Sequence, residues 1–333
     1  MNRDFVRRVK AALEALAVGD ALGMPVEYMT YDEIKTKFGF VERLLNPSVS
    51  RIHSNLPKGA ITDDTEQVLY LIHQYLKDKN ITVDGTVRAL LQWYEAKDPA
   101  TTGYIGPSSR KALERLKSGE LPEVTGIEGV TCGGAMRMPA VALCTPRENY
   151  DQLIENVYAA LLPTHNTNLA IEGAAALAFG MHAAASGARI SEVMERSLQG
   201  AKLGRTRGRQ LVGASTEARI RLVISIIAQL KNREQIMRFL YSTIGTEMFT
   251  NQVVPVIFGI VLYSHDNPWQ AICMGASIGG DTDTIAGLSG FFTTLLTGEH
   301  NIPREVVHYV ISQNQLVLDE IAYNIVQEFW QGL

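Results

Sequence analysis

The sequence predicts an all-α protein that folds as a single compact multi-helix domain over residues 1–333. Apolar residues recur mostly at intervals of three and four positions, as they do on one face of a helix, and the alternating pattern of a β-strand is scarce. No internal repeat, proline-rich linker or low-complexity segment marks a domain boundary. Two acidic segments, at residues 62–65 and 279–284, must converge across most of the chain if they share a site, which also favours one domain.

The first helix is expected near residues 3–22. Phe5, Val9 and Leu13 fall four positions apart on one face, and Gly23 supplies a stop. A second helix is expected to be capped by Asp63, with Glu66 three positions later, and to end near Asn80. Similar patterns predict helices near residues 83–96, 108–117 behind Pro107, 149–161, 168–185, 216–230, 233–243 and 268–274.

Composition excludes some classes of function. A chain of 333 residues with 46% hydrophobic residues can bury a large core, and a formal charge of −4 gives no general attraction for phosphate backbones or anionic lipid, so no nucleic-acid partner is expected. The strongest local basic run, residues 202–209, is interpreted as a solvated loop rather than a phosphate site.

Cysteine usage and hydropathy predict a cytoplasmic protein. Three cysteines, an odd number without C-x-x-C spacing, indicate a reducing compartment. Glu14 and Asp20 interrupt the apolar positions of the first 23 residues, so no signal peptide is expected. The longest apolar runs are too short to span a bilayer, so no membrane partner is expected either, and a monomer is favoured.

The two acidic segments gather carboxylates and threonine hydroxyls, which suit Mg²⁺, Mn²⁺ or Ca²⁺ better than Zn²⁺. Each segment alone is equally typical of a helix cap or a turn. Together they bring four carboxylates to one volume, which favours a bound cation over mutual repulsion. An EF-hand is excluded because, counting from Asp281, Ile285 and Phe292 occupy positions that need oxygen ligands. A G-x-S-x-G pattern at residues 275–279 is interpreted as accidental, since no preceding strand is expected.

Five blocks, in their order and spacing, resemble the ADP-ribosylglycohydrolase family. They are G-D-A-L-G-M-P-V-E at residues 19–27, T-D-D-T at 62–65, G-G-A-M-R at 133–137, T-H at 164–165 and G-G-D-T-D-T at 279–284. The similarity covers roughly residues 5–300. It implies an all-helical domain with a binuclear centre, two Mg²⁺ or two Mn²⁺ ions, that cleaves the glycosidic bond at the anomeric carbon of an ADP-ribosyl group.

The resemblance also assigns roles to residues of this chain. Glu27, as acid/base or water-orienting group, and Asp283 would be the catalytic residues. His165 would lie near the substrate, although for His165 and Arg137 a core histidine or a buried salt bridge is an equal alternative. The metal ligands would be Thr62, Asp63, Asp64, Asp281, Asp283 and Thr284, and the ribose and phosphate side would be lined by Gly133, Gly134, Ala135 and Met136.

The chain departs from the family pattern at three positions. Cys132 stands where Asn is expected, and Tyr104 stands where the arginine-directed branch has Asp, which disfavours an arginine-linked substrate. Tyr104, Gly106 and Cys132 are expected to contact the substrate, through a backbone-lined pocket or an aromatic contact. Glu66 either adds a carboxylate near the metals or caps its helix.

Three functional hypotheses follow. The leading one is a metal-dependent hydrolase that releases ADP-ribose from an ADP-ribosylated protein side chain or small molecule. The alternative is an N-ribosyl hydrolase acting on a nucleoside or related metabolite. The third is a non-catalytic ADP-ribose-binding, antitoxin-like or structural protein, which is disfavoured because all six ligand positions and Glu27 are present.

Overall fold

Helices make up the regular structure of the protein. The computed structural model describes residues 3–97 and 105–331. Within these ranges, strand-like pairing is limited to two isolated bridges, Thr131 with Phe249 and Thr167 with Arg209. The prediction of a single all-α domain is therefore confirmed.

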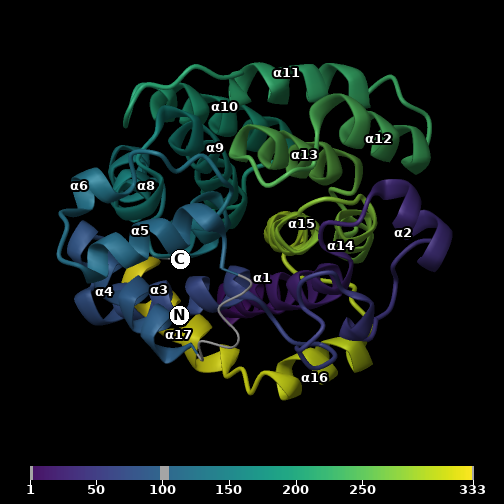
Figure 1. The fold of residues 1–333 in the computed structure, drawn as a ribbon, viewed down its shortest axis with the longest axis horizontal. Coiled ribbons are helices and arrows are strands. Elements are labelled where there is room, and N and C mark those ends of the chain that lie inside the picture. The colour runs from purple at the N-terminus through teal and green to yellow at the C-terminus, as the bar shows by residue number, and fades with distance from the viewer. Residues whose placement is uncertain (1–2, 98–104, 332–333) are drawn as a thin grey trace.

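The helices follow one another along the chain, and a long, mostly irregular segment of residues 39–62 joins α2 to α3 (Figure 1). Their bounds are α1 Arg3–Gly23, η1 Met24–Val26, α2 Tyr31–Phe38, η2 Pro47–Val49, α3 Asp63–Asp78, α4 Val83–Ala96, α5 Pro107–Lys117, α6 Pro122–Thr125, η4 Ala135–Arg137, α7 Met138–Leu143, α8 Tyr150–His165, α9 Asn168–Ala185, α10 Ile190–Arg205, α11 Thr216–Ile227, α12 Arg233–Phe239, η5 Leu240–Ile244, α13 Thr250–Tyr263, α14 Pro268–Ser277, α15 Thr282–Thr297, α16 Arg304–Gln313 and α17 Leu318–Phe329.

Close packing of α1 against α15 forms the centre of the fold (Figure 1). A Cβ atom added at Gly19 would lie 2.5 Å from the carbonyl oxygen of Ala286, and one added at Gly23 would lie 2.3 Å from that of Thr282. Only glycine allows the two backbones to approach so closely. The contact brings the end of α1, which leads to Glu27, next to the start of α15.

The sequence patterns gave bounds for nine of the described α-helices and misjudged some of their ends, and they gave no bounds for α2, α6, α7, α10, α13, α15, α16 and α17. Helix α3 is capped by Thr62, whose side chain accepts a hydrogen bond from the Asp64 N–H, and not by Asp63 as expected. Helix α8 continues past the predicted end through Pro163 to His165. Helix α12 ends at Phe239, and the following turn is a π-helix, η5. Local pattern alone does not fix such ends because tertiary contacts decide them.

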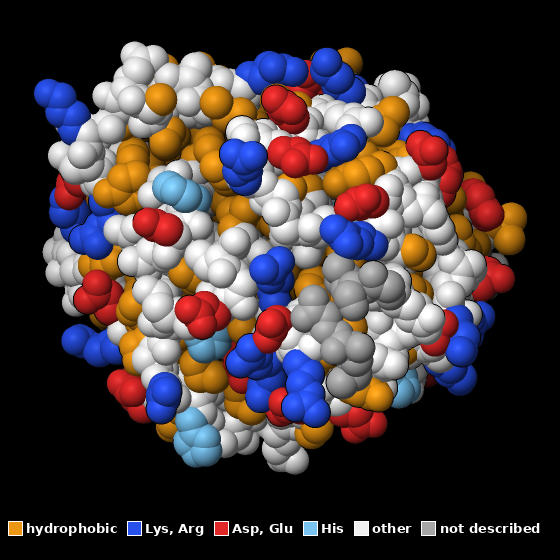
Figure 2. Space-filling view, turned by 180° about the vertical axis from the view of Figure 1, so that it is seen from behind, with side chains coloured by type: hydrophobic (Ala, Val, Ile, Leu, Met, Phe, Trp, Pro, Cys, Tyr) orange, Lys and Arg blue, Asp and Glu red, His pale blue; other side chains and the backbone are white. Residues whose placement is uncertain are grey.

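The solvated-loop interpretation of residues 202–209 is wrong in part, because residues 202–205 form the last turn of α10. Arg205 donates to the buried carboxylate of Glu172 at 2.9 Å, and Arg207 forms an ion pair with Glu155. These arginines therefore tie the run to α9 and α8. On the face shown in Figure 2, positive and negative side chains are interspersed and no broad basic patch is seen.

Two further expectations concern cysteines and membrane spans. Cys132, Cys144 and Cys273 are all free thiols in the interior. Among the helices of residues 3–97 and 105–331, none combines the length and apolarity that a bilayer span requires.

Candidate metal centre

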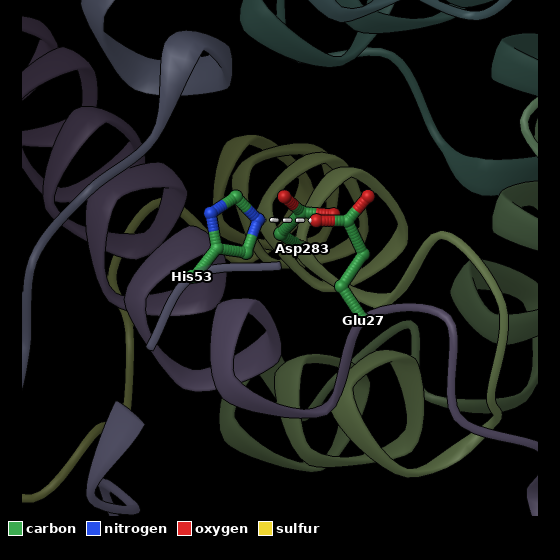
Figure 3. Close-up of side chains that lie close together, drawn as sticks. All are labelled: Glu27, His53 and Asp283. Atoms are coloured by element: carbon green, nitrogen blue, oxygen red, sulfur yellow. Dashed lines mark hydrogen bonds and ion pairs between the residues drawn. The ribbon is translucent and has the colours of Figure 1, made fainter. Parts of the chain in front are cut away.

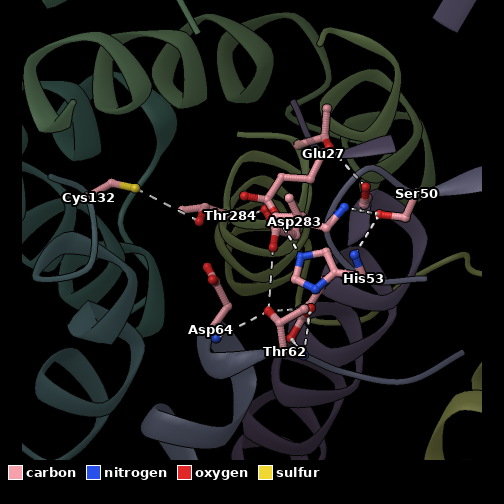
Figure 4. Close-up of polar contacts among 12 residues, drawn as sticks. Glu27, Ser50, His53, Thr62, Asp64, Cys132, Asp283 and Thr284 are labelled. Atoms are coloured by element: carbon pink, nitrogen blue, oxygen red, sulfur yellow. Dashed lines mark hydrogen bonds and ion pairs between the residues drawn. The ribbon is translucent and has the colours of Figure 1, made fainter. Parts of the chain in front are cut away.

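The two acidic segments meet in the interior, at the first turns of α3 and α15. Thr62 and Asp283 lie 3.5 Å apart between their Oγ1 and Oδ2 atoms, although they are separated by 221 positions in the chain. Figure 4 shows Thr62 and Asp64 next to Asp283 and Thr284. Because both helices begin here, their free N–H groups and dipoles add positive potential beside the carboxylates. All six predicted ligand residues are buried.

Asp20, on α1, fixes the start of α3. Its carboxylate accepts hydrogen bonds from the Thr62 N–H at 3.0 Å, the Thr62 hydroxyl at 2.9 Å and the Thr65 N–H at 3.1 Å, and also from the Thr65 hydroxyl. Burial and the charge of Asp283 raise the pKa of Asp20 to about 7, against the effect of these donors. Asp20 therefore holds the ligand-bearing turn in place, a role that the sequence pattern did not reveal.

Glu27 reaches the same place from the end of η1 and forms a buried group with His53 and Asp283 (Figure 3). Its Oε2 atom lies 2.5 Å from Nε2 of His53, and ligand atoms of all three residues lie within 4.8 Å of one another. The following residue, Tyr28, adopts a positive φ of 61°, which is rare for an aromatic residue. Sequence reasoning missed His53, because it stands in an irregular loop without a characteristic spacing.

The loop before α15 is clamped by backbone hydrogen bonds. The carbonyl of Gly280 accepts from the Tyr28 N–H at 2.8 Å, the Gly280 N–H donates to Met29 at 3.0 Å, and the Asp281 N–H donates to Thr246 at 2.9 Å. Gly280 has a φ of 80°, and an added Cβ would lie 2.1 Å from the Thr246 carbonyl oxygen. The loop therefore admits only glycine at this position.

Substitution of Gly280 by Ala is expected to weaken Mn²⁺ binding by more than tenfold, because the new methyl group must displace the loop that carries Asp281. Titration calorimetry would measure the affinity. Gly187→Ala is the control: Gly187 also has a positive φ, of 90°, but nothing lies within 4 Å of its Cβ position, so it should lose only about 1–2 kcal/mol of stability and no affinity. Equal Mn²⁺ affinity in the two variants would contradict the expected role of the clamp.

A cavity of about 180 Å³ opens onto the carboxylates. Its acidic lining residues are Glu27, Asp63, Asp64, Asp281 and Asp283, with Thr284 beside them, and most of its other lining residues are apolar or glycine. Its remaining lining residues are Tyr28, Ile52, Ile105, Gly106, Pro107, Thr131, Cys132, Gly133, Met136 and Met248. A larger cavity of about 690 Å³ lies between α2 and α12–α14, but its Lys35 and Glu234 form an ion pair and it contains no acidic cluster. The chemistry therefore places the candidate site in the smaller cavity.

The electrostatics of the cluster fit divalent cations. Burial, followed by the charge of Asp283, raises the pKa of Glu27, Asp63, Asp64 and Asp281 above their ordinary values. Among residues 3–97 and 105–331, the buried Oδ1 atom of Asp64 has no hydrogen-bond partner. Buried carboxylates in such mutual repulsion are stabilised by bound cations, and hard oxygen donors select Mg²⁺, Mn²⁺ or Ca²⁺. The residues present therefore suit a metal centre.

Cys132 borders the cluster directly (Figure 4). Its thiol donates to Oδ2 of Asp281 at 2.6 Å, and its Sγ atom lies 4.0 Å from Oγ1 of Thr284. Burial raises the pKa of this thiol, and the neighbouring Asp281 charge adds to the effect. Of the glycine-rich block after it, Gly133 and Met136 line the cavity, whereas Gly134 and Ala135 do not.

His165 and Arg137 do not line the cavity, and the His165 ring lies directly behind it, against Gly133 and Gly134. The His165 ring is fully buried beneath Gly134, bonded to the hydroxyls of Thr131 at 3.1 Å and Thr164 at 2.8 Å. Burial lowers the pKa of this ring, which keeps it neutral at pH 7. Arg137 donates from the interior to Gln67, Thr164 and Ser109, so a buried hydrogen-bond network holds its guanidinium group.

The two remaining sequence expectations concern Tyr104 with Gly106, and Glu66. Gly106 lines the cavity, whereas Tyr104 lies outside the described residues. Glu66 does not cap α3 and does not line the cavity, although its charge helps to raise the pKa of Asp63. Its carboxylate accepts from Nε1 of Trp93 at 3.0 Å and pairs with Lys97. Contacts with α4 thus take this side chain away from the cavity.

Fold and site together define an all-α protein with a buried carboxylate centre suited to divalent cations. The model of the ADP-ribosylglycohydrolase family matches residues 1–332, so the chain belongs to this family. It is 28% identical over 317 residues to the protein YegU of Escherichia coli, covering 95% of each chain. It is 24% identical to the ADP-ribosylarginine hydrolase Tri1 of Pseudomonas putida, covering 91% of this chain and 74% of that one. Among solved structures, an ADP-ribosylglycohydrolase-related protein complex has the same fold, with a TM-score of 0.66, 21% identity and full coverage of both chains.

Proposed function

We propose that this protein is a metal-dependent hydrolase that cleaves the glycosidic bond of an ADP-ribosyl conjugate and releases ADP-ribose. The observation that carries the proposal is the meeting of two remote acidic segments around one cavity, where a buried carboxylate oxygen of Asp64 has no partner in the part of the chain that the structure describes. Membership of the ADP-ribosylglycohydrolase family supports a glycosidase activity, and the names of relatives such as Tri1 indicate ADP-ribosyl substrates.

The proposed centre holds two Mg²⁺ or Mn²⁺ ions. Its ligands are Thr62, Asp63, Asp64, Asp281, Asp283 and Thr284, which lie at the two helix N-termini. Divalent cations in such a centre bind vicinal hydroxyls of a ribose and lower the pKa of a water molecule. Asp20 supports the ligands from α1 through its hydrogen bonds to Thr62 and Thr65.

Glu27 is the proposed proton-transfer residue. It is buried, lines the cavity and stands beside the ligand carboxylates rather than at a helix start. Cleavage of a ribosyl bond develops positive charge on the sugar and requires a proton to be taken from water or given to the leaving group. Burial raises the pKa of the Glu27 carboxyl group, so it holds a proton at a higher pH than an exposed glutamate does.

The cavity size limits how much of the substrate enters. About 180 Å³ is well below the roughly 300–1,000 Å³ of pockets that bury a drug-sized ligand. We therefore propose that the ribose next to the scissile bond enters the cavity. The rest of the ADP-ribosyl group then lies outside it. This size also keeps open the alternative of a nucleoside N-ribosyl hydrolase, whose substrate is smaller.

The apolar residues that line the cavity indicate which leaving groups it favours. Among the described lining residues, Ile52, Ile105, Pro107 and Met248 are apolar, and the carboxylates all belong to the acidic cluster. A guanidinium leaving group would need a separate carboxylate to pair with. We therefore propose that serine-linked, acyl-linked or small-molecule conjugates are cleaved better than arginine-linked ones. We also propose a cytoplasmic location, because three buried free thiols fit a reducing compartment.

A substrate panel tests the proposal. Purified protein would be incubated with ADP-ribosyl-serine, ADP-ribosyl-arginine, O-acetyl-ADP-ribose and several nucleosides, with Mg²⁺, Mn²⁺ or EDTA, and products would be separated by chromatography. We expect chelator-sensitive release of ADP-ribose from at least one conjugate. Release of a free base from nucleosides alone would support the N-ribosyl alternative, and Mg²⁺-dependent binding of ADP-ribose without turnover would support a non-catalytic binding protein.

A further inference from the structure

His53 occupies a fixed position next to the centre. It lies in the loop between η2 and α3 and is 2% exposed. Its N–H donates to the hydroxyl of Ser50 at 3.0 Å, and its carbonyl accepts from the Leu56 N–H at 3.0 Å. These bonds fix the backbone of His53, from which its buried ring reaches Glu27.

Glu27, in contrast, follows the end of a short helix and precedes the positive-φ residue Tyr28. A hydrogen bond joins Oε2 of its side chain to Nε2 of the His53 ring, while the second oxygen points away from that ring (Figure 3). Glu27 lines the cavity and His53 does not. One carboxyl oxygen is thus engaged by the histidine and the other is free to face the reacting groups.

We propose that His53 is a positioning residue that orients the carboxyl group of Glu27 toward the sugar. This role rests on the proposed function and assigns His53 no direct contact with the substrate. A carboxyl group without such a partner rotates about its terminal torsion, which is broad and weakly restrained. Supporting hydrogen bonds of this kind commonly change activity by about 10–100-fold.

The same geometry permits a different role, in which His53 donates its ring nitrogen to a metal together with Glu27 and Asp283. The contact of 2.5 Å between His53 and Glu27 favours positioning, since Nε2 is already engaged by the carboxyl group. The two roles make opposite predictions for metal binding. If His53 positions Glu27, replacing His53 leaves the metal affinity unchanged. If His53 is a metal ligand, replacing it lowers the metal affinity.

The first experiment compares His53→Leu with His53→Gln on the best conjugate of the panel. We expect His53→Leu to lower kcat by about 10–100-fold with KM within about twofold of wild type, and His53→Gln, which keeps a hydrogen-bonding side chain, to recover most of kcat. His182→Leu is the matched control, because His182 is also buried but bonds only to backbone, at Ala142 and Glu148. An unchanged kcat in His53→Leu would overturn the proposal, as would an equal loss in both Leu variants.

The second experiment measures Mn²⁺ affinity and pulsed EPR spectra of the wild type and His53→Leu. Equal affinities and the absence of imidazole nitrogen couplings are expected. A tenfold weaker affinity, or nitrogen couplings that disappear in His53→Leu, would overturn positioning in favour of ligation.

A third measurement separates this proposal from the proposed function, because it needs no turnover. If His53 and Glu27 act on each other, the melting temperature of His53→Leu combined with Glu27→Ala should differ clearly from the sum of the two single effects. Additive effects would overturn the pairing even in an active protein. Clearly non-additive melting temperatures in a protein that cleaves no conjugate would support the pairing of His53 with Glu27 and contradict the proposed function.

Discussion

Asp283→Asn is expected to stabilise the metal-free protein and to abolish its stabilisation by Mg²⁺ or Mn²⁺. The charge of Asp283 helps to raise the pKa of Asp20, Glu27, Asp63, Asp64 and Asp281, so it opposes the ionisation of the whole cluster. Asparagine has nearly the same shape but no charge. Wild type should gain about 2.7 kcal/mol of stability when metal is present at a hundred times its Kd, and the variant almost nothing.

The same repulsion sets the pH dependence of the metal-free protein. Asp20 has a folded-state pKa of about 7, above its ordinary value of 3.8, so the folded protein binds the proton more tightly than the unfolded chain does. Stability from this group is present in full below about pH 4 and is lost as the pH rises towards 7. We therefore expect metal-free wild type to unfold at a lower temperature at pH 8 than at pH 5, and this difference to be smaller in Asp283→Asn.

Glu66→Gln is the control for this prediction. Glu66 lies on the same turn of α3 as the ligands, but it pairs with Lys97 and contacts Trp93 instead of the cavity. Its loss should leave the stabilisation by Mn²⁺ intact. Melting curves recorded with EDTA and with increasing Mn²⁺ concentrations would measure how much Mn²⁺ stabilises each variant. Stabilisation of Asp283→Asn by Mn²⁺ to the same extent as wild type would remove Asp283 from the ligand set.

Much of the fold could be predicted because its signals are local. The period of Phe5, Val9 and Leu13 indicates the buried face of α1, and the stop at Gly23 coincides with its end. The meeting of the two acidic segments was also predictable, because four carboxylates and two helix N-termini can form one cation site only if they lie close together. Their cavity, by contrast, is a property of packing between segments more than two hundred positions apart.

Other parts of the site depend on tertiary contacts that no local pattern contains. The capping-box spacing of residues 63–66 predicted a local role for Glu66, but Trp93 on α4 and Lys97 directly after α4 bind its carboxylate. Motif similarity located His165, whereas only the structure shows that its ring lies beneath Gly134 and not in the cavity. His53 carries no motif at all, and its closeness to Glu27 results from the path of an irregular loop.

Glu27→Gln is expected to lower kcat by about 10²–10⁴-fold, the usual contribution of general acid–base catalysis, and to change Mn²⁺ affinity only a few-fold. Glutamine keeps an oxygen that can accept a hydrogen bond from His53, so the side chain should stay in place while it loses the ability to exchange a proton. Steady-state kinetics and calorimetry on the same preparation would measure both effects. A variant that loses metal binding together with turnover would show that Glu27 is a ligand rather than a proton-transfer group.

Substrates with different leaving groups can show which proton Glu27 moves. If Glu27 protonates the leaving group, the kcat loss in Glu27→Gln should be small for a conjugate whose leaving group departs as an anion, such as p-nitrophenolate, and large for an alkyl-linked one. If Glu27 instead takes the proton of the attacking water, both conjugates should lose kcat to a similar degree, because both need the same nucleophile. For each conjugate, the kcat of the wild type is the reference from which the loss in Glu27→Gln is calculated. The ratio of the two losses therefore separates a general acid from a general base at the same residue.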